Sequence, residues 1–283
     1  MKIIKTVRDM QDFSESLRLR GKRIAFVPTM GYLHNGHLEL MKEGKKLADC
    51  LITSIYVNPT QFGPDEDLDK YPRDFEGDER LSRNVGVDVI FYPANSQMYP
   101  ENYHTYVTVE NITDNLCGLS RPCFFRGVTT ICAKLFNIVK PHVTIFGRKD
   151  FQQLVVIKRM VTDLNMDIEV VGMPTVREPD GLAMSSRNAY LKEDERESAL
   201  SLSRSLKYAA ELYERGERDA GVIIKEVKDF IEKHPGTRID YAKICDVETM
   251  KDVERLDGRS VLALAVWVGT PRLIDNYVFG ENK

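Results

Sequence analysis

The stretch Phe26-Val-Pro-Thr-Met-Gly-Tyr-Leu-His-Asn-Gly-His37 decides the fold, because it joins a predicted strand (residues 23–28) to a predicted helix (residues 36–48). In an open α/β sheet this is the carboxyl end of a strand, the edge at which ligands bind. The first turn of a helix has backbone N–H groups without intrahelical partners, and the helix dipole favours negative charge there. Gly36 has no side chain to obstruct a ligand. The stretch therefore predicts a phosphate-binding site.

His34 and His37 are three residues apart, so both side chains are expected on one side of that first turn. A histidine pair there can donate hydrogen bonds to phosphate oxygens, whose negative charge grows as the α-phosphorus is attacked. Two other interpretations stay open. The histidines can be satisfied within the turn itself, or they can bind zinc, which would need a third ligand nearby.

The chain around this stretch alternates short β-branched runs with longer helical patterns, which is typical of βαβ units and a parallel sheet. We predict an α/β fold with a Rossmann-like parallel sheet. Further strands are expected at residues 51–57, 88–92, 142–146 and 168–176, and further helices at residues 7–19, 128–139 and 151–164.

The pattern changes at Arg177-Glu-Pro-Asp-Gly181, where Pro and Gly interrupt both periodicities. Two helices (residues 193–215 and 220–234) and three strands (residues 239–245, 260–268 and 272–277) are expected after it. Helices followed by consecutive strands indicate a separate, smaller α+β domain. We therefore predict a nucleotide-binding domain at residues 1–176 and a C-terminal domain at residues 177–283.

A second candidate segment, Phe146-Gly-Arg-Lys-Asp-Phe-Gln-Gln153, also runs from a predicted strand into a predicted helix. Lys149 offers a positive charge for phosphate. Asp150 can accept hydrogen bonds from ribose hydroxyls, or it can cap the helix. Gln153, one turn later, can direct an amide at a substrate.

The third candidate segment is Asp180-Gly-Leu-Ala-Met-Ser-Ser-Arg-Asn188, at the predicted domain boundary. Two hydroxyls followed by an arginine supply donors suited to a triphosphate, on a loop expected to be mobile and able to close over a site. The alternative is a polar connection with Asp and Ser in turn positions.

Composition narrows the class of protein. The 283 residues include 40 Lys+Arg and 43 Asp+Glu, a formal net charge of −3, which provides no general attraction to nucleic acid or to an anionic membrane. The longest apolar run, residues 261–268, is too short to span a bilayer, and the N-terminus becomes polar too soon for a signal peptide. Five cysteines without a CxxC pair are typical of reduced core thiols. A cytoplasmic enzyme with a small anionic ligand is expected.

In this order, the three segments resemble those of the pantothenate synthetase (pantoate–β-alanine ligase) family, within the HxGH nucleotidyltransferase superfamily. The resemblance covers nearly the whole chain and extends to Tyr56-Val-Asn-Pro-Thr-Gln-Phe62, Asp67-Leu-Asp-Lys-Tyr-Pro72 and Pro174-Thr-Val-Arg-Glu178. It implies that ATP and pantoate form pantoyl adenylate and pyrophosphate, after which the amine of β-alanine displaces AMP. It also implies Mg²⁺ with the ATP and a homodimer.

The resemblance implies site residues as well. Those lining the ATP site would be Met30, Gly31, Tyr32, Leu33, His34, Asn35, Gly36, His37, Gly147, Arg148, Lys149, Asp150, Val176, Met184, Ser185, Ser186 and Arg187. Catalysis would fall to His34, His37, Lys149, Ser185, Ser186 and Arg187, with His37 as proton donor. Gln61 and Gln153 would bind pantoate, Gln61 also near β-alanine, and Val176 would lie beside the adenine through its backbone.

Two features of the resemblance stay unassigned. Arg148 stands where Glu or Gln is most often expected in the family, and it can either strengthen phosphate binding or face solvent. No set of residues resembles a protein cage for Mg²⁺, so no metal ligands are predicted; such ions are often held by phosphates and water.

Two rival functions are also considered. An adenylyltransferase that moves AMP onto a phosphate would use the same histidine pair, but its acceptor phosphate should call for more cations than Gln61 and Gln153 provide. A non-catalytic nucleotide- or RNA-binding relative of the aminoacyl-tRNA synthetases is disfavoured by the near-neutral charge and by the intact set of catalytic residue types.

Overall fold

The computed structural model describes residues 1–64 and 66–281, and the chain divides into two compact units. The N-terminal unit consists of Met1–Val109, Arg121–Arg148 and Val156–Pro174, and the C-terminal unit of Glu110–Ser120, Lys149–Val155 and Thr175–Lys283. Two short segments from the first two-thirds of the chain thus belong to the C-terminal unit. The simpler division into residues 1–176 and 177–283 stays a prediction.

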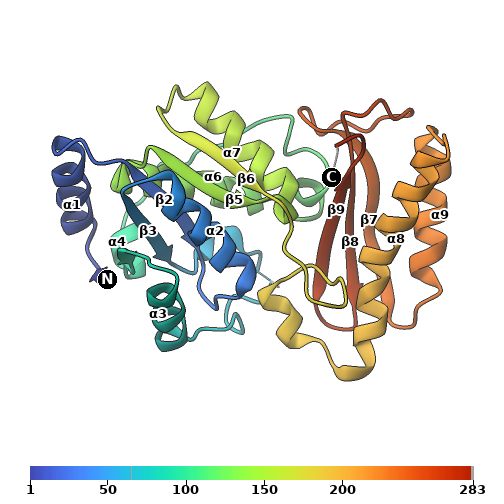
Figure 1. Ribbon diagram of the computed structural model, residues 1–283, viewed down its shortest axis with the longest axis horizontal. Helices are drawn as coiled ribbons and strands as arrows, with labels where there is room; N and C mark the ends of the chain where they lie inside the picture. Colours follow the sequence, from blue (N-terminus) through green and yellow to red (C-terminus); the bar gives the residue numbers. More distant parts are fainter. Residues whose placement is uncertain (65, 282–283) are drawn as a thin grey trace. The chain divides into compact units, whose positions relative to one another are not determined.

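The N-terminal unit is built on a parallel sheet, which confirms the predicted α/β class (Figure 1). Within the described residues its order is β1-β4-β3-β2-β5-β6. Most positions of β2, β3, β4 and β5 are buried, as expected for a sheet covered on both faces. The strands are β1 (Lys2–Ile4), β2 (Ile24–Thr29), β3 (Cys50–Ile55), β4 (Val89–Phe91), β5 (Val143–Gly147) and β6 (Glu169–Met173).

The strand order reverses between β2 and β5. From β2 the chain proceeds through β3 and β4 on one side, and it returns through β5 and β6 on the other. The two strands pair directly, with Ala25 opposite Val143 and Phe26 opposite Thr144. The carboxyl ends of strands that diverge in this way leave a crevice in which ligands bind. The histidine stretch follows β2 at this point.

The helices of this unit depart from expectation mainly in two places. Helix α6 begins four residues before its predicted start, and α3 was not predicted. Helix α2 packs against β2, β3 and β5, while α1 and α6 contact each other and β2. The helices are α1 (Val7–Leu19), α2 (Asn35–Leu47), α3 (Phe75–Asn84), α4 (Asn95–Met98) and α6 (Phe124–Val139), with a short 3₁₀ turn η1 (Pro59–Gln61). The 3₁₀ turn η2 (Arg148–Asp150) and helix α7 (Phe151–Asp163) are divided between the units, since Lys149–Val155 belongs to the C-terminal one.

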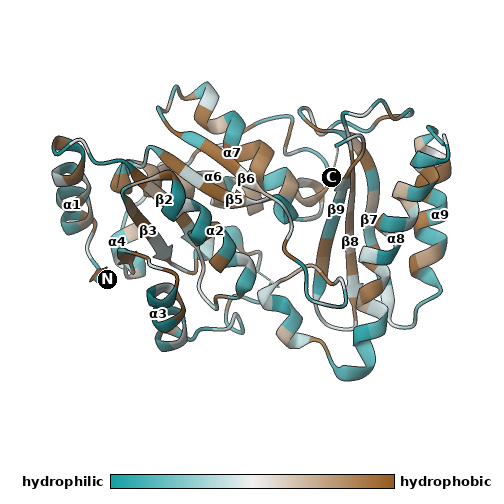
Figure 2. Cartoon of the chain, in the orientation of Figure 1, coloured by the Kyte–Doolittle hydropathy of each residue, from teal (hydrophilic) through white to brown (hydrophobic). Residues whose placement is uncertain are grey.

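The C-terminal unit has the predicted α+β character. An antiparallel sheet in the order β7-β8-β9 packs with α8 and α9, and both helices show apolar and polar faces (Figure 2). Leu206, Ile223 and Leu264 belong to its core. The elements are α5 (Cys117–Ser120), η3 (Ser186–Tyr190), η4 (Glu193–Glu195), α8 (Arg196–Glu214), α9 (Ala220–Glu232), β7 (Thr237–Asp246), β8 (Ser260–Val268) and β9 (Arg272–Val278).

Gln152 explains why two distant segments join the C-terminal unit together. Its buried amide donates from Nε2 to the carbonyl oxygens of Ile112 (2.9 Å) and Asn115 (2.8 Å), and its Oε1 accepts from the backbone N–H of Cys117 (3.0 Å). Three hydrogen bonds from one buried side chain thus fasten residues 110–120 to the start of α7. Among the described residues, no helix is long and apolar enough to cross a membrane.

Candidate nucleotide site

The loop after β2 is held in place by a carboxylate from α3. Oδ2 of Asp78 accepts from the backbone N–H of Tyr32 (2.9 Å), and Oδ1 accepts from that of Leu33 (2.7 Å). Asp78 is only 2% exposed, and this burial raises its pKa, although the two N–H donors oppose the shift. The sequence alone does not reveal this role, because the partners of Asp78 lie more than forty positions away.

The loop needs its glycine. Gly31 has φ +84° and Tyr32 has φ 51°, so two successive residues adopt the left-handed region. A Cβ atom on Gly31 would lie 2.8 Å from Oδ2 of Asp78. The chain therefore wraps closely around the carboxylate, much as a backbone nest binds an anion.

The two histidines of the stretch cap α2 and also contact each other. Nδ1 of His34 accepts from the N–H of Gly36 (3.1 Å), and Nδ1 of His37 accepts from the N–H of His34 (3.3 Å), forming a capping box. The ring centroids are 4.1 Å apart. The interpretation that the histidines are satisfied within the turn is thus correct for one nitrogen of each ring.

This capping has a consequence for ligand binding. Backbone N–H groups at the start of α2 were predicted to face a phosphate. In the structure the N–H of Gly36 instead donates to Nδ1 of His34. A neutral imidazole carries one ring proton, so an accepting Nδ1 assigns that proton to Nε2. In the neutral form each histidine therefore carries its ring proton on Nε2, and the N–H of Gly36 is already used within the turn.

Gln61 lies beside the same loop, at the end of η1. Its Oε1 accepts from Nδ2 of Asn58 (3.0 Å), and its Nε2 lies 3.2 Å from Sδ of Met30. Asn58 is itself almost fully buried and also donates to the carbonyl of Gly127 (3.1 Å). The orientation of the Gln61 amide is therefore fixed by a rigid neighbour.

The segment after β5 divides between the two units. Gly147 ends the strand, and Nε of Arg148 donates to the carbonyl oxygen of Gly172 on β6 (3.2 Å). Neither role considered for Arg148, binding phosphate or facing solvent, includes this contact. The guanidinium stabilises the end of the neighbouring strand.

In the C-terminal unit, Lys149 is fixed through its backbone. Nδ2 of Asn276 on β9 donates to the carbonyl oxygen of Lys149 (2.9 Å). Nζ of Lys149 lies 3.7 Å from Oδ2 of Asp150, a loose pair that leaves the ammonium available to a more negative ligand. Gln153 follows one turn later in α7 and is half-buried.

The third candidate segment packs near this lysine. A small pocket, partly open to solvent and with room for about one water molecule, is lined by Lys149, Ser185, Asn188 and Asp275, among others. Met184 donates its N–H to the carbonyl oxygen of Val176 (2.9 Å).

Ser185 organises the turn that carries the remaining candidates. Its Oγ accepts from the N–H of Arg187 (3.2 Å), capping η3, which begins at Ser186. Each unit thus assembles its own share of the predicted residues.

The part of the chain that the structure describes offers no metal cage. Among residues 1–64 and 66–281, no group of three His, Cys, Asp or Glu side chains could hold a metal ion. The donor set thus does not fit a metal bound by protein ligands alone, and zinc binding by the histidine pair lacks its third ligand.

Known proteins resemble this chain along its whole length. A profile of the family described as pantoate-beta-alanine ligase matches residues 2–278. A protein of Syntrophus aciditrophicus named pantothenate synthetase is 69% identical over 281 residues, covering 99% of this chain and 98% of that protein. One of the same name from Geobacter sulfurreducens is 57% identical over 283 residues and covers both chains fully.

Two solved structures are similar as well. Pantothenate synthetase from Thermus thermophilus has a TM-score of 0.93 at 40% identity, covering 98% of this chain and 99% of that one. Pantoate-beta-alanine ligase from Francisella tularensis, complexed with beta-gamma ATP and beta-alanine, has a TM-score of 0.82 at 31% identity, covering 100% and 99%.

Proposed function

The chain belongs to the pantoate-beta-alanine ligase family, and from this premise we propose that it ligates pantoate and β-alanine to pantothenate, with ATP consumed through a pantoyl adenylate. The observation that carries the proposal is the histidine pair at the start of α2, whose capping bonds fix the orientation of both rings at the carboxyl end of β2. Donors fixed beforehand act most strongly on charge that develops during the reaction.

The first step makes the carboxylate reactive. A carboxylate is a poor acyl donor because its leaving group would be an oxide ion. A carboxylate oxygen of pantoate attacks the α-phosphorus of ATP, the bond from that phosphorus to the bridging oxygen breaks, and pyrophosphate leaves. We assign His34 and His37 to the phosphate oxygens, with His37 as proton donor.

The second step forms the amide. The amine of β-alanine attacks the carbonyl carbon, the bond between that carbon and the AMP oxygen breaks, AMP leaves and the nitrogen loses a proton. Because water also attacks a mixed anhydride, the reacting carbon must be shielded from solvent between the two steps.

The remaining assignments follow the resemblance and suit the local chemistry. Lys149, Ser185, Ser186 and Arg187 would bind phosphate, since charged and hydroxyl donors match its oxygens. Gln61 and Gln153 would hydrogen-bond pantoate, whose hydroxyls suit neutral amides. The fixed orientation of the Gln61 amide supports this assignment.

The remaining candidate residues of the two units would bind the nucleotide. The loop from Met30 to Leu33, together with Asn35, Gly36, Gly147, Arg148, Asp150 and Met184, is assigned to ATP, and the backbone of Val176 to its adenine. Mg²⁺ would accompany ATP and neutralise phosphate charge, held by phosphate oxygens and water because the described residues form no cage.

The resemblance also supports a homodimer in the cytoplasm, with small molecules as ligands. The net charge of −3 agrees with the absence of a nucleic-acid partner from the proposal. Light scattering on the purified chain tests the dimer, and a monomeric mass would remove that part of the proposal.

The test of the reaction is AMP release with each substrate omitted in turn. Ligation predicts steady release of AMP only when ATP, pantoate and β-alanine are all present, with pantothenate formed in equal amount. Equal AMP release without either substrate would contradict the proposal. An adenylyltransferase would instead transfer AMP to a phosphate acceptor, and a binding protein would release none.

A further inference from the structure

The residues before Ser185 form a tight hairpin in the C-terminal unit. Met184 donates its N–H to the carbonyl of Val176 (2.9 Å), and Glu178 donates to the carbonyl of Leu182 (2.8 Å). Gly181 turns the chain with φ +101°, a conformation that only glycine adopts easily. The hairpin therefore determines where Met184, and the phosphate-binding candidates that follow it, are presented.

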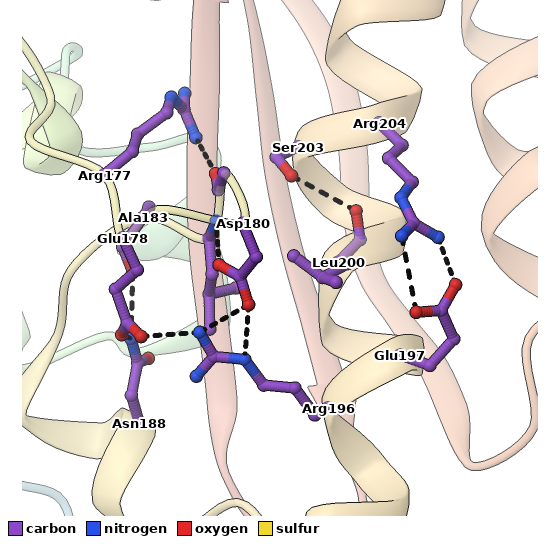
Figure 3. Close-up of polar contacts among 12 residues, drawn as sticks. Arg177, Glu178, Asp180, Ala183, Asn188, Arg196, Glu197, Leu200, Ser203 and Arg204 are labelled. Carbon is purple, nitrogen blue, oxygen red and sulfur yellow. Dashed lines mark hydrogen bonds and ion pairs between the residues drawn. The ribbon is translucent and has the colours of Figure 1, made fainter.

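One arginine outside the hairpin fastens it to α8. Nη2 of Arg196, the first residue of α8, donates to Oε2 of Glu178 (2.5 Å) and to Oδ2 of Asp180 (2.7 Å), and its Nε also donates to Oδ2 of Asp180 (2.8 Å). Figure 3 shows the guanidinium between the two carboxylates. Both acidic residues belong to the hairpin, so α8 holds it at two points.

Glu178 also connects Arg196 to Asn188, the C-terminal residue of the candidate segment. Its Oε1 accepts from Nδ2 of Asn188 (2.7 Å), which also donates to the carbonyl of Ala183 (3.1 Å). With Arg196 on one oxygen and Asn188 on the other, a single carboxylate connects α8 to both ends of the stretch that contains Met184–Arg187 (Figure 3).

We propose that Arg196 is a positioning residue for ATP: through Glu178 and Asp180 it holds the hairpin so that Met184–Arg187 meets the nucleotide. The inference rests on the proposed function, in which that segment binds phosphate. Arg196 itself is assigned no contact with substrate.

The structure provides a matched control on the same helix. The Arg196 side chain is 33% exposed and that of Arg204 is 45% exposed, so replacing either should change global stability little. Arg204 donates its hydrogen bonds to Glu197 (Figure 3), and its charge acts on the hairpin only through a weaker electrostatic interaction with Asp180. A difference between the two variants therefore measures the effect of the hydrogen bonds from Arg196 to Glu178 and Asp180, rather than the effect of losing a surface charge.

The experiment compares Arg196→Met, Arg196→Lys and Arg204→Met in the full chain. Hydrogen–deuterium exchange over residues 176–188 is measured without ligand, the ATP dissociation constant by calorimetry, and KM and kcat by AMP release. For Arg196→Met we expect exchange to speed up, and the ATP dissociation constant and KM for ATP to rise, each about tenfold, with KM for β-alanine unchanged. Arg196→Lys should recover part of the loss, and Arg204→Met should match the wild type.

Three results would overturn the inference: wild-type exchange in Arg196→Met, faster exchange with unchanged ATP affinity, or equal effects in Arg204→Met. Failure of the proposed function is seen separately. If the wild-type chain binds ATP but forms no pantothenate, ligation is wrong, and exchange and ATP affinity still decide the role of Arg196. A wild-type chain that does not bind ATP would refute both.

Discussion

Replacing Asp78 by Asn should loosen the loop that follows β2. The carboxylate accepts two hydrogen bonds on two different oxygens, from Tyr32 and from Leu33. An amide has one acceptor oxygen, so one of the two N–H groups would face an NH₂ group instead. A buried donor without an acceptor costs about 1–3 kcal/mol.

The net loss should be somewhat smaller than that penalty. Burial raises the pKa of Asp78, so removing its charge returns part of the free energy. We expect the free energy of unfolding to fall by about 1–2 kcal/mol, measured by urea denaturation at neutral pH. Since the loop carries the residues assigned to ATP, KM for ATP should rise as well.

Asp74 provides the control, because it lies just before the same helix. Its Oδ1 accepts one hydrogen bond, from the N–H of Gly77 (3.0 Å), and Asn is an equally good residue at a helix N-cap. Asp74→Asn should therefore be nearly neutral. If Asp78→Asn is as stable as the wild type and keeps its KM for ATP, the carboxylate does not hold the loop and the reasoning is refuted.

Two further predictions concern the histidine pair and the cysteines. His37→Ala should lower kcat about 10²–10³-fold, as loss of a transition-state donor does. The free energy of unfolding, measured by urea denaturation, should fall by no more than about 1 kcal/mol, because the capping bond that is removed is long, at 3.3 Å. Unchanged turnover would remove His37 from catalysis. In the native protein at pH 8, a thiol reagent should modify the exposed Cys123 rapidly. It should not modify Cys132, because burial raises the pKa of that thiol to about 12. A fast phase of thiol modification that persists in Cys123→Ser would contradict this.

The sheet could be predicted from the sequence because its strands are apolar runs separated by helical periods. Two of the elements that were not predicted, β1 and α3, were missed for different reasons. Strand β1 has three residues, two of them exposed. Helix α3 has only two apolar side chains that pack against the core, Phe75 and Leu81, and the residues it buries fully are Gly77, Asp78 and Ser82. A helix whose fully buried residues are small or polar is specified in part by distant partners, which local periodicity does not reveal.

The candidate site divides in the same way. His34, His37 and Lys149 are candidates from the sequence because their residue types and positions suit phosphate. Asp78 and Arg196 were not, since their roles depend on pairs brought together only by folding. The capping bonds of the histidines were foreseen only as an alternative to ligand binding, whereas the two nitrogens of an imidazole allow both.

The most direct test of acyl adenylation follows the oxygen atoms. Pantoate labelled with ¹⁸O in its carboxylate is incubated with ATP, β-alanine and the enzyme, and AMP and pyrophosphate are analysed by mass spectrometry. If the carboxylate attacks the α-phosphorus, one labelled oxygen stays on that phosphorus when the amine displaces AMP, so each AMP should carry one ¹⁸O and pyrophosphate none. Unlabelled AMP formed together with pantothenate would contradict the adenylate.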